Sequence, residues 1–250
     1  MTAMAWLLTL LFLLWVGGGI SVPGVTVSTV VDLQKRIIGG QTCEPTDRLY
    51  HVMLIANDGN HNFLCGGSLI SDRWILTAAH CWKTGGTMTA HLSVHPGNNR
   101  QPGVAITRHE TFPDEIRDHD IMLLELPNPT KVTPVSLPDC QNQRTVPLGA
   151  TVQIAGYGPK AQGEGPSDTL QCATNEVVSC ADQNDQFRFC GQSSGVSTCS
   201  GDSGGGVVYN GRISGVIRGL DRTNICMEKS AFVNVCSYRK WINRITGLDC

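Results

Sequence analysis

The chain has 250 residues, of which 41% are hydrophobic and 16% charged, with a formal net charge of −2. This length suffices for one large domain or two small domains that share an interface. The near-neutral charge excludes the basic field that a nucleic-acid-binding surface needs. The 11 cysteines favour a secreted protein with a disulfide framework.

Residues 1–21 are predicted to be a signal peptide. They hold a leucine-rich apolar run from Ala5 to Val16, followed by small residues, and this run is too short to span a membrane. The segment before the run lacks Lys and Arg, so an uncleaved anchor is the alternative. No later stretch is apolar for long enough to cross a bilayer. We therefore expect a secreted, extracellular protein with no membrane or nucleic-acid partner.

Residues 22–36 are predicted to be an activation propeptide. They end in Lys35-Arg36, and the apolar sequence Ile37-Ile38 with two glycines follows. A basic residue directly before an apolar segment has the form of a proteolytic processing site. The alternative is an ordinary strand, although the two glycines would weaken its start.

Short apolar segments separated by Gly, Asn, Asp and Pro predict an all-β chain from residue 50 onward. Residues 57–60 (Asn-Asp-Gly-Asn) and Asn210-Gly211 are hairpin signals. The expected strands include Tyr50–Ala56, Phe63–Ile70, Trp74–Thr77, Val104–His109, Ile121–Leu126, Val152–Ile154, Gly206–Tyr209 and Ile213–Ile217.

The end of the chain predicts the single clear helix. Tyr238, Trp241, Ile242 and Ile245 recur at helical spacing, and Gly247 is placed to end the helix. The proline-rich stretch 127–138 is the natural crossing between two halves, about 37–130 and 131–250.

The stretch Cys199–Gly206 predicts a nucleophile loop. Ser203 lies there among four glycines, which allow the backbone to bend sharply and to approach a ligand. A serine on such a turn can expose its hydroxyl beside backbone N–H groups, as acyl transfer requires. The alternative, a flexible linker, is disfavoured because apolar Val207 and Val208 follow at once.

A base and an acid are expected to accompany Ser203. His80 follows an apolar segment, lies among small residues and precedes Cys81. Asp120 directly precedes a fully apolar segment, so its carboxylate is expected to be partly buried and paired. His80 is the expected partner, while His119 and Asp118 remain open as alternatives on spacing alone.

Four motifs then occur in one order: Ile-Ile-Gly-Gly at 37–40, Thr-Ala-Ala-His-Cys at 77–81, Asp-Ile-Met-Leu-Leu at 120–124 and Gly-Asp-Ser-Gly-Gly at 201–205. In these motifs, and from residue 36 to about 245, the chain resembles the trypsin/chymotrypsin family of serine proteases. The resemblance implies two six-stranded antiparallel β-barrels with a C-terminal helix and a serine endopeptidase without cofactor or metal; no calcium site is expected in the carboxylate-free segment 95–103.

The resemblance also implies roles. His80 becomes the general base, Asp120 its orienting acid and Ser203 the nucleophile, with the N–H groups of Gly201 and Ser203 as oxyanion hole. Cleavage after Arg36 is expected to release an Ile37 amine that pairs with Asp202, so activity should fail at high pH when that amine loses its proton. The implied partners are a peptide or protein substrate, an activating protease and protein inhibitors.

The cysteines are assigned by the same resemblance. A further pair of the family is missing here, with Val152 and Tyr209 in its place, and Cys250 is left as a free terminal thiol or the site of an intermolecular disulfide. The implied disulfides are Cys43–Cys172, Cys65–Cys81, Cys140–Cys236, Cys180–Cys190 and Cys199–Cys226.

The substrate pocket departs from trypsin. Ser197, six residues before Ser203, stands where trypsin-like enzymes carry an aspartate, and Arg218-Gly219-Leu220 replaces the family's Ser-Trp-Gly. Leu220 and the facing Ser230 are expected to narrow the pocket for small or apolar side chains. Arg218 is expected either to compete with His80 for Asp120 or to turn outward; the alternative function is therefore a binding protein with impaired catalysis.

Overall fold

The computed structural model describes residues 37–97, 101–114, 116–141, 144–161, 163–182, 185–218 and 226–249. The predicted signal peptide and propeptide, Arg36, Gly219, Leu220 and Cys250 lie outside the described residues.

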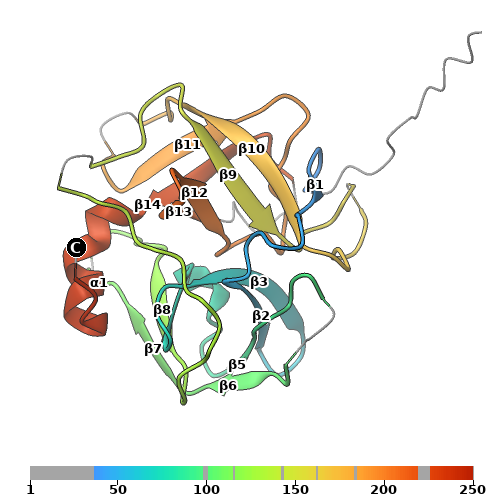
Figure 1. The fold of residues 1–250 in the computed structure, drawn as a ribbon, viewed down its shortest axis with the longest axis vertical. Coiled ribbons are helices and arrows are strands. Elements are labelled where there is room, and N and C mark those ends of the chain that lie inside the picture. The colour runs from blue at the N-terminus through green and yellow to red at the C-terminus, as the bar shows by residue number, and fades with distance from the viewer. Residues whose placement is uncertain are drawn as a thin grey trace, which may run out of the picture. The chain divides into compact units, whose positions relative to one another are not determined.

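The first sheet closes into a barrel through one continuous segment (Figure 1). Its strand order is β6-β5-β2-β3-β4-β8-β7. Strands β6 and β7 are separated only by Thr107, and they pair with β5 and β8 respectively, so that together they act as one closing strand. The bounds are β2 His51–Asn57, β3 Asn62–Leu69, β4 Trp74–Thr77, β5 Thr87–His91, β6 Val104–Ile106, β7 Arg108–Thr111 and β8 Met122–Glu125.

The second sheet closes through β9, which pairs with both β10 and β12. Its order is β1-β10-β11-β14-β13-β12-β9. The first strand of the described chain pairs with β10. Gln41 and Thr42 therefore belong to the second barrel, although the predicted first half begins at residue 37. The bounds are β1 Gln41–Thr42, β9 Thr151–Gly156, β10 Gln171–Val178, β11 Arg188–Gln192, β12 Gly206–Tyr209, β13 Arg212–Arg218 and β14 Lys229–Asn234.

Both predicted hairpin turns are present. Asn57 lies opposite Asn62 in the β2–β3 pair, with Gly59 at φ 96° in the turn. Asn210 and Gly211 join β12 to β13 with φ values of 49° and 74°. Positive φ at both residues is what a tight two-residue hairpin requires.

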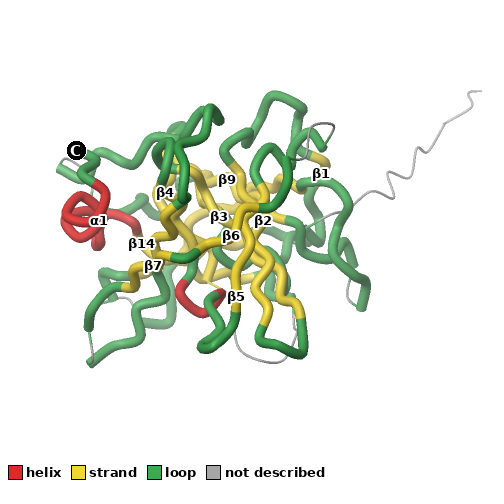
Figure 2. The backbone as a smooth tube through the Cα atoms, turned by 90° about the horizontal axis from the view of Figure 1, so that it is seen from below, coloured by secondary structure: helices red, strands yellow, loops and turns green. Residues whose placement is uncertain are grey.

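The C-terminal helix packs on the first barrel. A short 3-10 turn, η2 (Val235–Tyr238), leads into α1 (Arg239–Thr246), and Gly247 ends the helix in the left-handed conformation, with φ 71°. Trp241 and Ile242 are buried in one apolar cluster with residues of β4 and β8. Figure 2 shows α1 at the edge of the strands. The expected fold, two β-barrels with one terminal helix, is confirmed.

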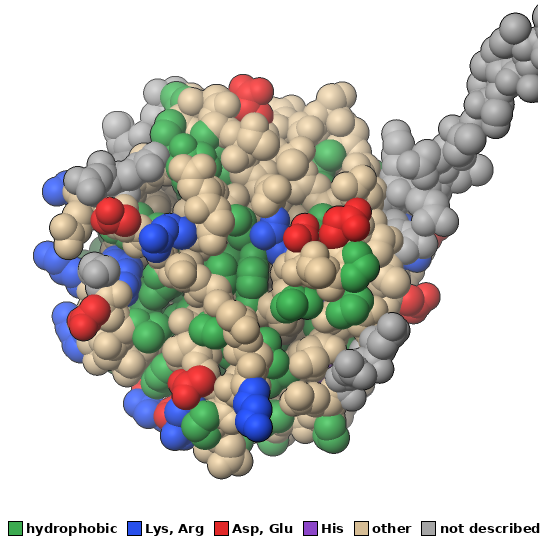
Figure 3. Space-filling view, in the orientation of Figure 1, with side chains coloured by type: hydrophobic (Ala, Val, Ile, Leu, Met, Phe, Trp, Pro, Cys, Tyr) green, Lys and Arg blue, Asp and Glu red, His purple; other side chains and the backbone are tan. Residues whose placement is uncertain are grey.

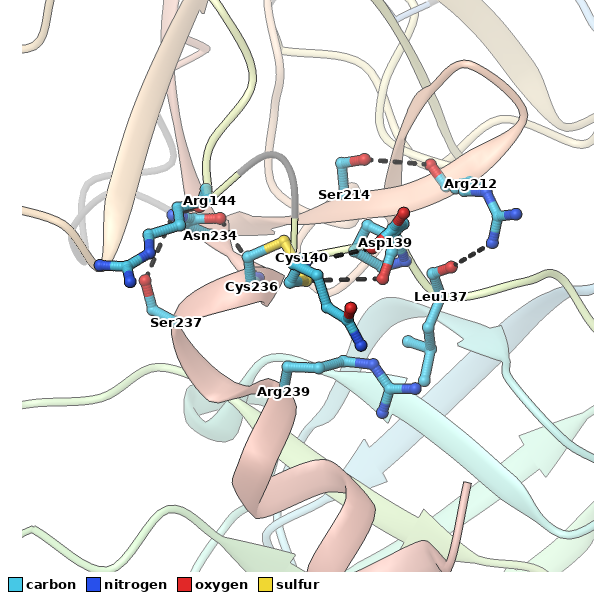
Figure 4. The surroundings of a disulfide bond; sticks show 12 residues. Leu137, Asp139, Cys140, Arg144, Arg212, Ser214, Asn234, Cys236, Ser237 and Arg239 are labelled. Atoms are coloured by element: carbon cyan, nitrogen blue, oxygen red, sulfur yellow. Dashed lines mark hydrogen bonds between the residues drawn. A yellow bond between two sulfur atoms is a disulfide. The ribbon is translucent and has the colours of Figure 1, made fainter. Parts of the chain in front are cut away.

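The described cysteines form five disulfides, and they are the pairs that the resemblance implied. Cys140–Cys236 fastens the segment between the barrels to the turn before α1 (Figure 4). Beside it, the amide of Asn234 donates hydrogen bonds to the carbonyl groups of Arg144 and Gln186. The helix is therefore tied covalently and by hydrogen bonds to the crossing segment.

On the face shown in Figure 3, the described Lys and Arg side chains lie among Asp and Glu side chains. Among the described residues, no helix is long and apolar enough to cross a membrane.

Candidate active site

Strand pairing brings His80 and Asp120 together. Strand β4 ends at Thr77, and the 3-10 turn Ala79–Cys81 that follows carries His80. Asp120 lies just before β8, whose first residue, Met122, pairs with Thr77. The pairing of these two apolar strands therefore brings together the polar residues next to their ends, His80 and Asp120.

The carboxylate of Asp120 is held by two groups of His80. Ring nitrogen Nδ1 lies 3.0 Å from Oδ1 and 2.9 Å from Oδ2, and the backbone N–H of His80 donates to Oδ1 at 2.9 Å. Asp120 is 6% exposed. Burial alone would raise the pKa of Asp120, but the hydrogen bonds and charge of His80, with the charge of Arg218, hold that pKa below its usual value. The anion is thus the stable form, and it orients the imidazole ring.

The two alternatives for the partner of Asp120 are engaged elsewhere. The ring of His119 lies 2.7 Å from the hydroxyl of Tyr238 through Nδ1 and 2.8 Å from Asp114 through Nε2. Asp118 accepts a hydrogen bond from Arg218. His80 is therefore the imidazole that pairs with Asp120.

The Ser203 loop is seated against both barrels. The N–H of Gly66 on β3 donates to the carbonyl of Ser203 at 2.7 Å, and the N–H of Gly204 donates to the carbonyl of Ile217 on β13 at 2.8 Å. Gly204 has φ 82°, and a Cβ on it would lie 2.4 Å from the Gly66 carbonyl oxygen. Only glycine meets both conditions, so the close seating of the loop depends on this position.

The sulfur of Cys81 lies between the His80 ring and the Ser203 loop. It is 3.9 Å from Nε2 of His80 and 3.9 Å from the carbonyl oxygen of Ser203. The ligand-type atoms of Cys65, His80 and Cys81 lie within 4.8 Å of one another. Because the two cysteines form a disulfide, they offer no thiolates, and this group does not make a metal site.

The N–H groups of Gly201 and Ser203 belong to the glycine-rich loop that carries the serine. In the described part of the chain, no acceptor takes a hydrogen bond from either group. Gly201 has φ 100°, a conformation that favours glycine. Two free N–H groups next to a serine are suited to stabilise an oxyanion.

Asp202, the next residue in the loop, is fully buried. Its carboxylate accepts hydrogen bonds from the N–H groups of Gly158 and Cys199, at 2.7 and 2.9 Å. Burial raises the pKa of Asp202 to about 6, although the two bonds oppose the change. The described residues place no Lys, Arg or His in a salt bridge with it. Among the described residues, this buried carboxylate therefore has no cationic partner.

Ile37 is buried close to this region. It is 0% exposed and belongs to the apolar cluster of the second barrel with Val196. Its neighbour Ile38 pairs with Ser197, whose N–H donates to the Ile38 carbonyl at 2.8 Å. Ile38 therefore contacts a residue that lies only two positions before Cys199 in the sequence, and the N–H of Cys199 donates to Asp202.

Ser197, predicted for the pocket floor, and Ser230, predicted for the pocket wall, are joined by Thr198, a residue that was not predicted. Thr198 follows Ser197 and pairs with Met227, and its Oγ1 lies 2.8 Å from the hydroxyl of Ser230 on β14. Thr198 is 8% and Ser230 1% exposed. The only signal in the sequence was the position of Thr198 next to Ser197.

Arg218 was predicted either to pair with Asp120 or to turn outward, and the structure combines the two arrangements. Nη2 donates to Asp118 at 3.2 Å, while Nε lies 3.8 Å from Oδ2 of Asp120. Its side chain is 23% exposed. The guanidinium thus points toward solvent at one end and stays beside Asp120 at the other, and the His80–Asp120 hydrogen bonds remain in place.

Comparison with known proteins agrees with this geometry. The sequence model of the family described as Trypsin matches residues 37–242. Anionic trypsin of Canis lupus familiaris is 32% identical over 88% of this chain and 93% of its own length. Kallikrein-8 of Homo sapiens is 31% identical, with 86% and 88% covered. A solved structure described as "Structure of GrC" has a TM-score of 0.73 and 26% identity, over 84% of this chain and 99% of that one.

The fold and the His80–Asp120 pair beside a glycine-rich serine loop are thus those of a chymotrypsin-like hydrolase. The chain belongs to the trypsin family of serine proteases. It is a serine endopeptidase, and its substrates are peptides or proteins.

Proposed function

We propose that Ser203, His80 and Asp120 form the catalytic triad. The observation that carries this proposal is the double attachment of His80 to Asp120, through ring Nδ1 and backbone N–H. The other ring nitrogen, Nε2, lies 3.9 Å from the Cys81 sulfur, which is itself 3.9 Å from the carbonyl oxygen of Ser203. Nε2 takes the hydroxyl proton as Ser203 attacks the substrate carbonyl, and later returns it to the leaving amine.

The same loop supplies the oxyanion hole. The N–H groups of Gly201 and Ser203 donate to the oxyanion of the tetrahedral intermediate, and one such donor is worth about 3 kcal/mol of transition-state stabilisation. Collapse of the intermediate expels the amine and leaves an acyl-enzyme on Ser203, which water then hydrolyses.

We infer that the residue before the cut bond is small or apolar. Ser197 brings no negative charge to the pocket floor, so a Lys or Arg side chain would lack the partner that makes its burial favourable. The hydroxyl groups of Thr198 and Ser230 are buried and bonded to each other, so they are not free to recognise a polar side chain of the substrate. This specificity differs from that of the trypsins among the relatives, and it rests on the described pocket residues alone.

We also infer that the protein is secreted as a zymogen and activated by cleavage after Arg36. Asp202 is fully buried among backbone donors and has no cation beside it in the part of the chain that the structure describes, and Ile37 is already docked in the second barrel. A new amine at Ile37 would supply the missing positive charge. An activating protease is therefore a partner, and protein inhibitors that enter the cleft are further partners.

The test is active-site labelling. The full chain is cleaved at Arg36 and treated with a fluorophosphonate probe, with the Ser203→Ala chain as control. Labelling of the cut protein but not of Ser203→Ala supports the triad; an Arg36→Gln precursor that reacts as fast as the cut form would contradict the activation step. Labelling no stronger than in the control would favour the alternative, a binding protein, for which Arg218 beside Asp120 is the supporting observation.

A further inference from the structure

Arg218 lies at the end of β13 and contacts two aspartates at once. Its Nη2 lies 3.2 Å from Oδ2 of Asp118, and its Nε lies 3.8 Å from Oδ2 of Asp120. Asp118 has 84% of its side chain exposed, whereas Asp120 has 6%. The arginine therefore connects a carboxylate in solvent to the buried carboxylate that orients His80.

The other charged groups around Arg218 have their own partners. These charged side chains and His119 line a pocket of about 350 Å³ beside Asp120. Arg188 pairs with Asp185, and the guanidinium of Arg117 lies over the ring of Phe187. His119 lies between Tyr238 and Asp114, and Asp182 lies on the same wall. In the described part of the chain, Arg218 is the arginine that forms salt bridges with Asp118 and Asp120.

The carboxylate of Asp120 lies closer to His80 than to Arg218. Oδ2 is 2.9 Å from Nδ1 of His80 but 3.8 Å from Nε of Arg218, which is beyond the range of a good hydrogen bond. Arg218 thus acts on Asp120 as a nearby charge and leaves the hydrogen bonds to His80. The direct bond from Nη2 to Asp118 holds the guanidinium at this distance.

We propose that Arg218 is a positioning residue for Asp120, tethered by Asp118, and that this pair sets the lower end of the pH range in which His80 works as a base. The inference rests on the proposed triad. The positive charge of Arg218 disfavours a second positive charge on the His80 ring, while the negative charge of Asp118 favours it. Lys83, whose Nζ donates to the His80 carbonyl oxygen at 3.0 Å, also disfavours it and is unchanged in every variant below. Asp118→Asn removes the negative charge but keeps an oxygen that can accept the hydrogen bond from Arg218. Removing the charge of Arg218 and removing the charge of Asp118 should therefore move the titration midpoint of the His80 ring in opposite directions.

The experiment follows the His80 ring directly. The Hε1 resonance of His80 is titrated by NMR in the cut Ser203→Ala protein, alone and with Arg218→Met, Arg218→Lys, Asp118→Asn or Arg188→Met. We expect Arg218→Met to move the titration midpoint upward by about 0.5 to 1 pH unit, and Asp118→Asn to move it downward by less, because Asp118 is exposed and screened. Arg218→Lys, which keeps the charge, should stay near the parent, as should Arg188→Met.

The same substitutions in the active Ser203 protein should shift the acidic limb of the kcat/KM profile by matching amounts. Superimposed titrations for Arg218→Met and Arg188→Met would overturn the inference, as would shifts of equal sign for Arg218→Met and Asp118→Asn. Failure of the proposed triad is recognised separately, by absent fluorophosphonate labelling of the cut protein that retains Ser203, because the titration in Ser203→Ala protein does not depend on turnover.

Discussion

The hydroxyl groups of Thr198 and Ser230 lie 2.8 Å apart, and both side chains are buried. Thr198 precedes the disulfide residue Cys199, and Ser230 comes from β14, so this contact joins two segments of the second barrel. We propose that this contact fixes the width of the pocket wall on which the proposed specificity depends.

Removing the Ser230 side chain should widen the pocket. We expect Ser230→Gly to raise kcat/KM for a substrate with Phe before the cut bond, relative to Ala, by roughly tenfold, because added apolar contact in a pocket is worth about 1 to 3 kcal/mol. The measurement is the ratio of kcat/KM for matched Phe and Ala peptides. Ser230→Val, which narrows the wall, should move the ratio the other way. Equal ratios in all three proteins would contradict this assignment of the wall.

The strands next to the site could be predicted because their apolar runs are local signals. Trp74–Thr77 is found at its predicted bounds, and Met122–Glu125 lies within the predicted segment 121–126. The strand Gln171–Val178 was missed because its buried positions include the polar Gln171 and Asn175. Their burial comes from the closure of the barrel, which no short sequence pattern reports.

The site was predictable where polar residues adjoin such runs, and not where side chains meet across the fold. His80 and Asp120 each follow or precede an apolar strand, so their meeting follows from the pairing of β4 with β8. The tether between Arg218 and Asp118 joins residues 100 positions apart. Its formation depends on the direction of two long side chains, which spacing does not encode.

In the uncut chain, the charge of Asp202 should destabilise the fold at neutral pH. Burial raises the pKa of this group from 3.8 to about 6, so the folded state holds the proton more tightly than the unfolded state. The stability present below pH 4 is therefore lost as pH rises to about 6, by about 3 kcal/mol. Urea unfolding of uncut Ser203→Ala protein between pH 4 and 7 measures this loss.

Asp202→Asn in the same uncut background is the control for this effect. The difference in free energy of unfolding between the two proteins should grow in favour of Asn as pH rises from 4 to 6. Cleavage after Arg36 should abolish that trend, because the Ile37 amine then pairs with the carboxylate. Parallel curves for the two uncut proteins would show that Asp202 has a cation already.

Acid should destabilise the fold through His51. This side chain is 2% exposed and lies 5.7 Å from the ring of Tyr157. Burial, with the charges of Arg48 and His95, lowers the pKa of His51 from 6.5 to about 3. Below pH 6.5, His51 is therefore protonated in the unfolded chain but stays neutral in the folded chain. The free energy of unfolding falls as a result, by about 3 kcal/mol at pH 4.5.

His51→Gln removes the titrating group, so its free energy of unfolding should depend less on pH between 6.5 and 4.5 than that of the parent. Urea midpoints measured in the cut Ser203→Ala background give the comparison. His61→Gln is the matched control, since the side chain of His61 is 74% exposed. An identical pH response in His51→Gln and His61→Gln proteins would be evidence against the buried, neutral state of His51.

The pocket of Asp202 should tolerate no side chain at Gly158. A Cβ there would lie 2.5 Å from Oδ2 of Asp202, whereas a Cβ at Gly165 meets nothing within 4 Å. Gly158→Ala should therefore displace the carboxylate and the adjoining Ser203 N–H, and slow fluorophosphonate labelling by roughly a hundredfold, the cost of a misplacement of about 1 Å. Gly165→Ala should label like the parent. If Gly158→Ala, folded by circular dichroism, labels at the parent rate, the coupling of Asp202 to the oxyanion loop is wrong.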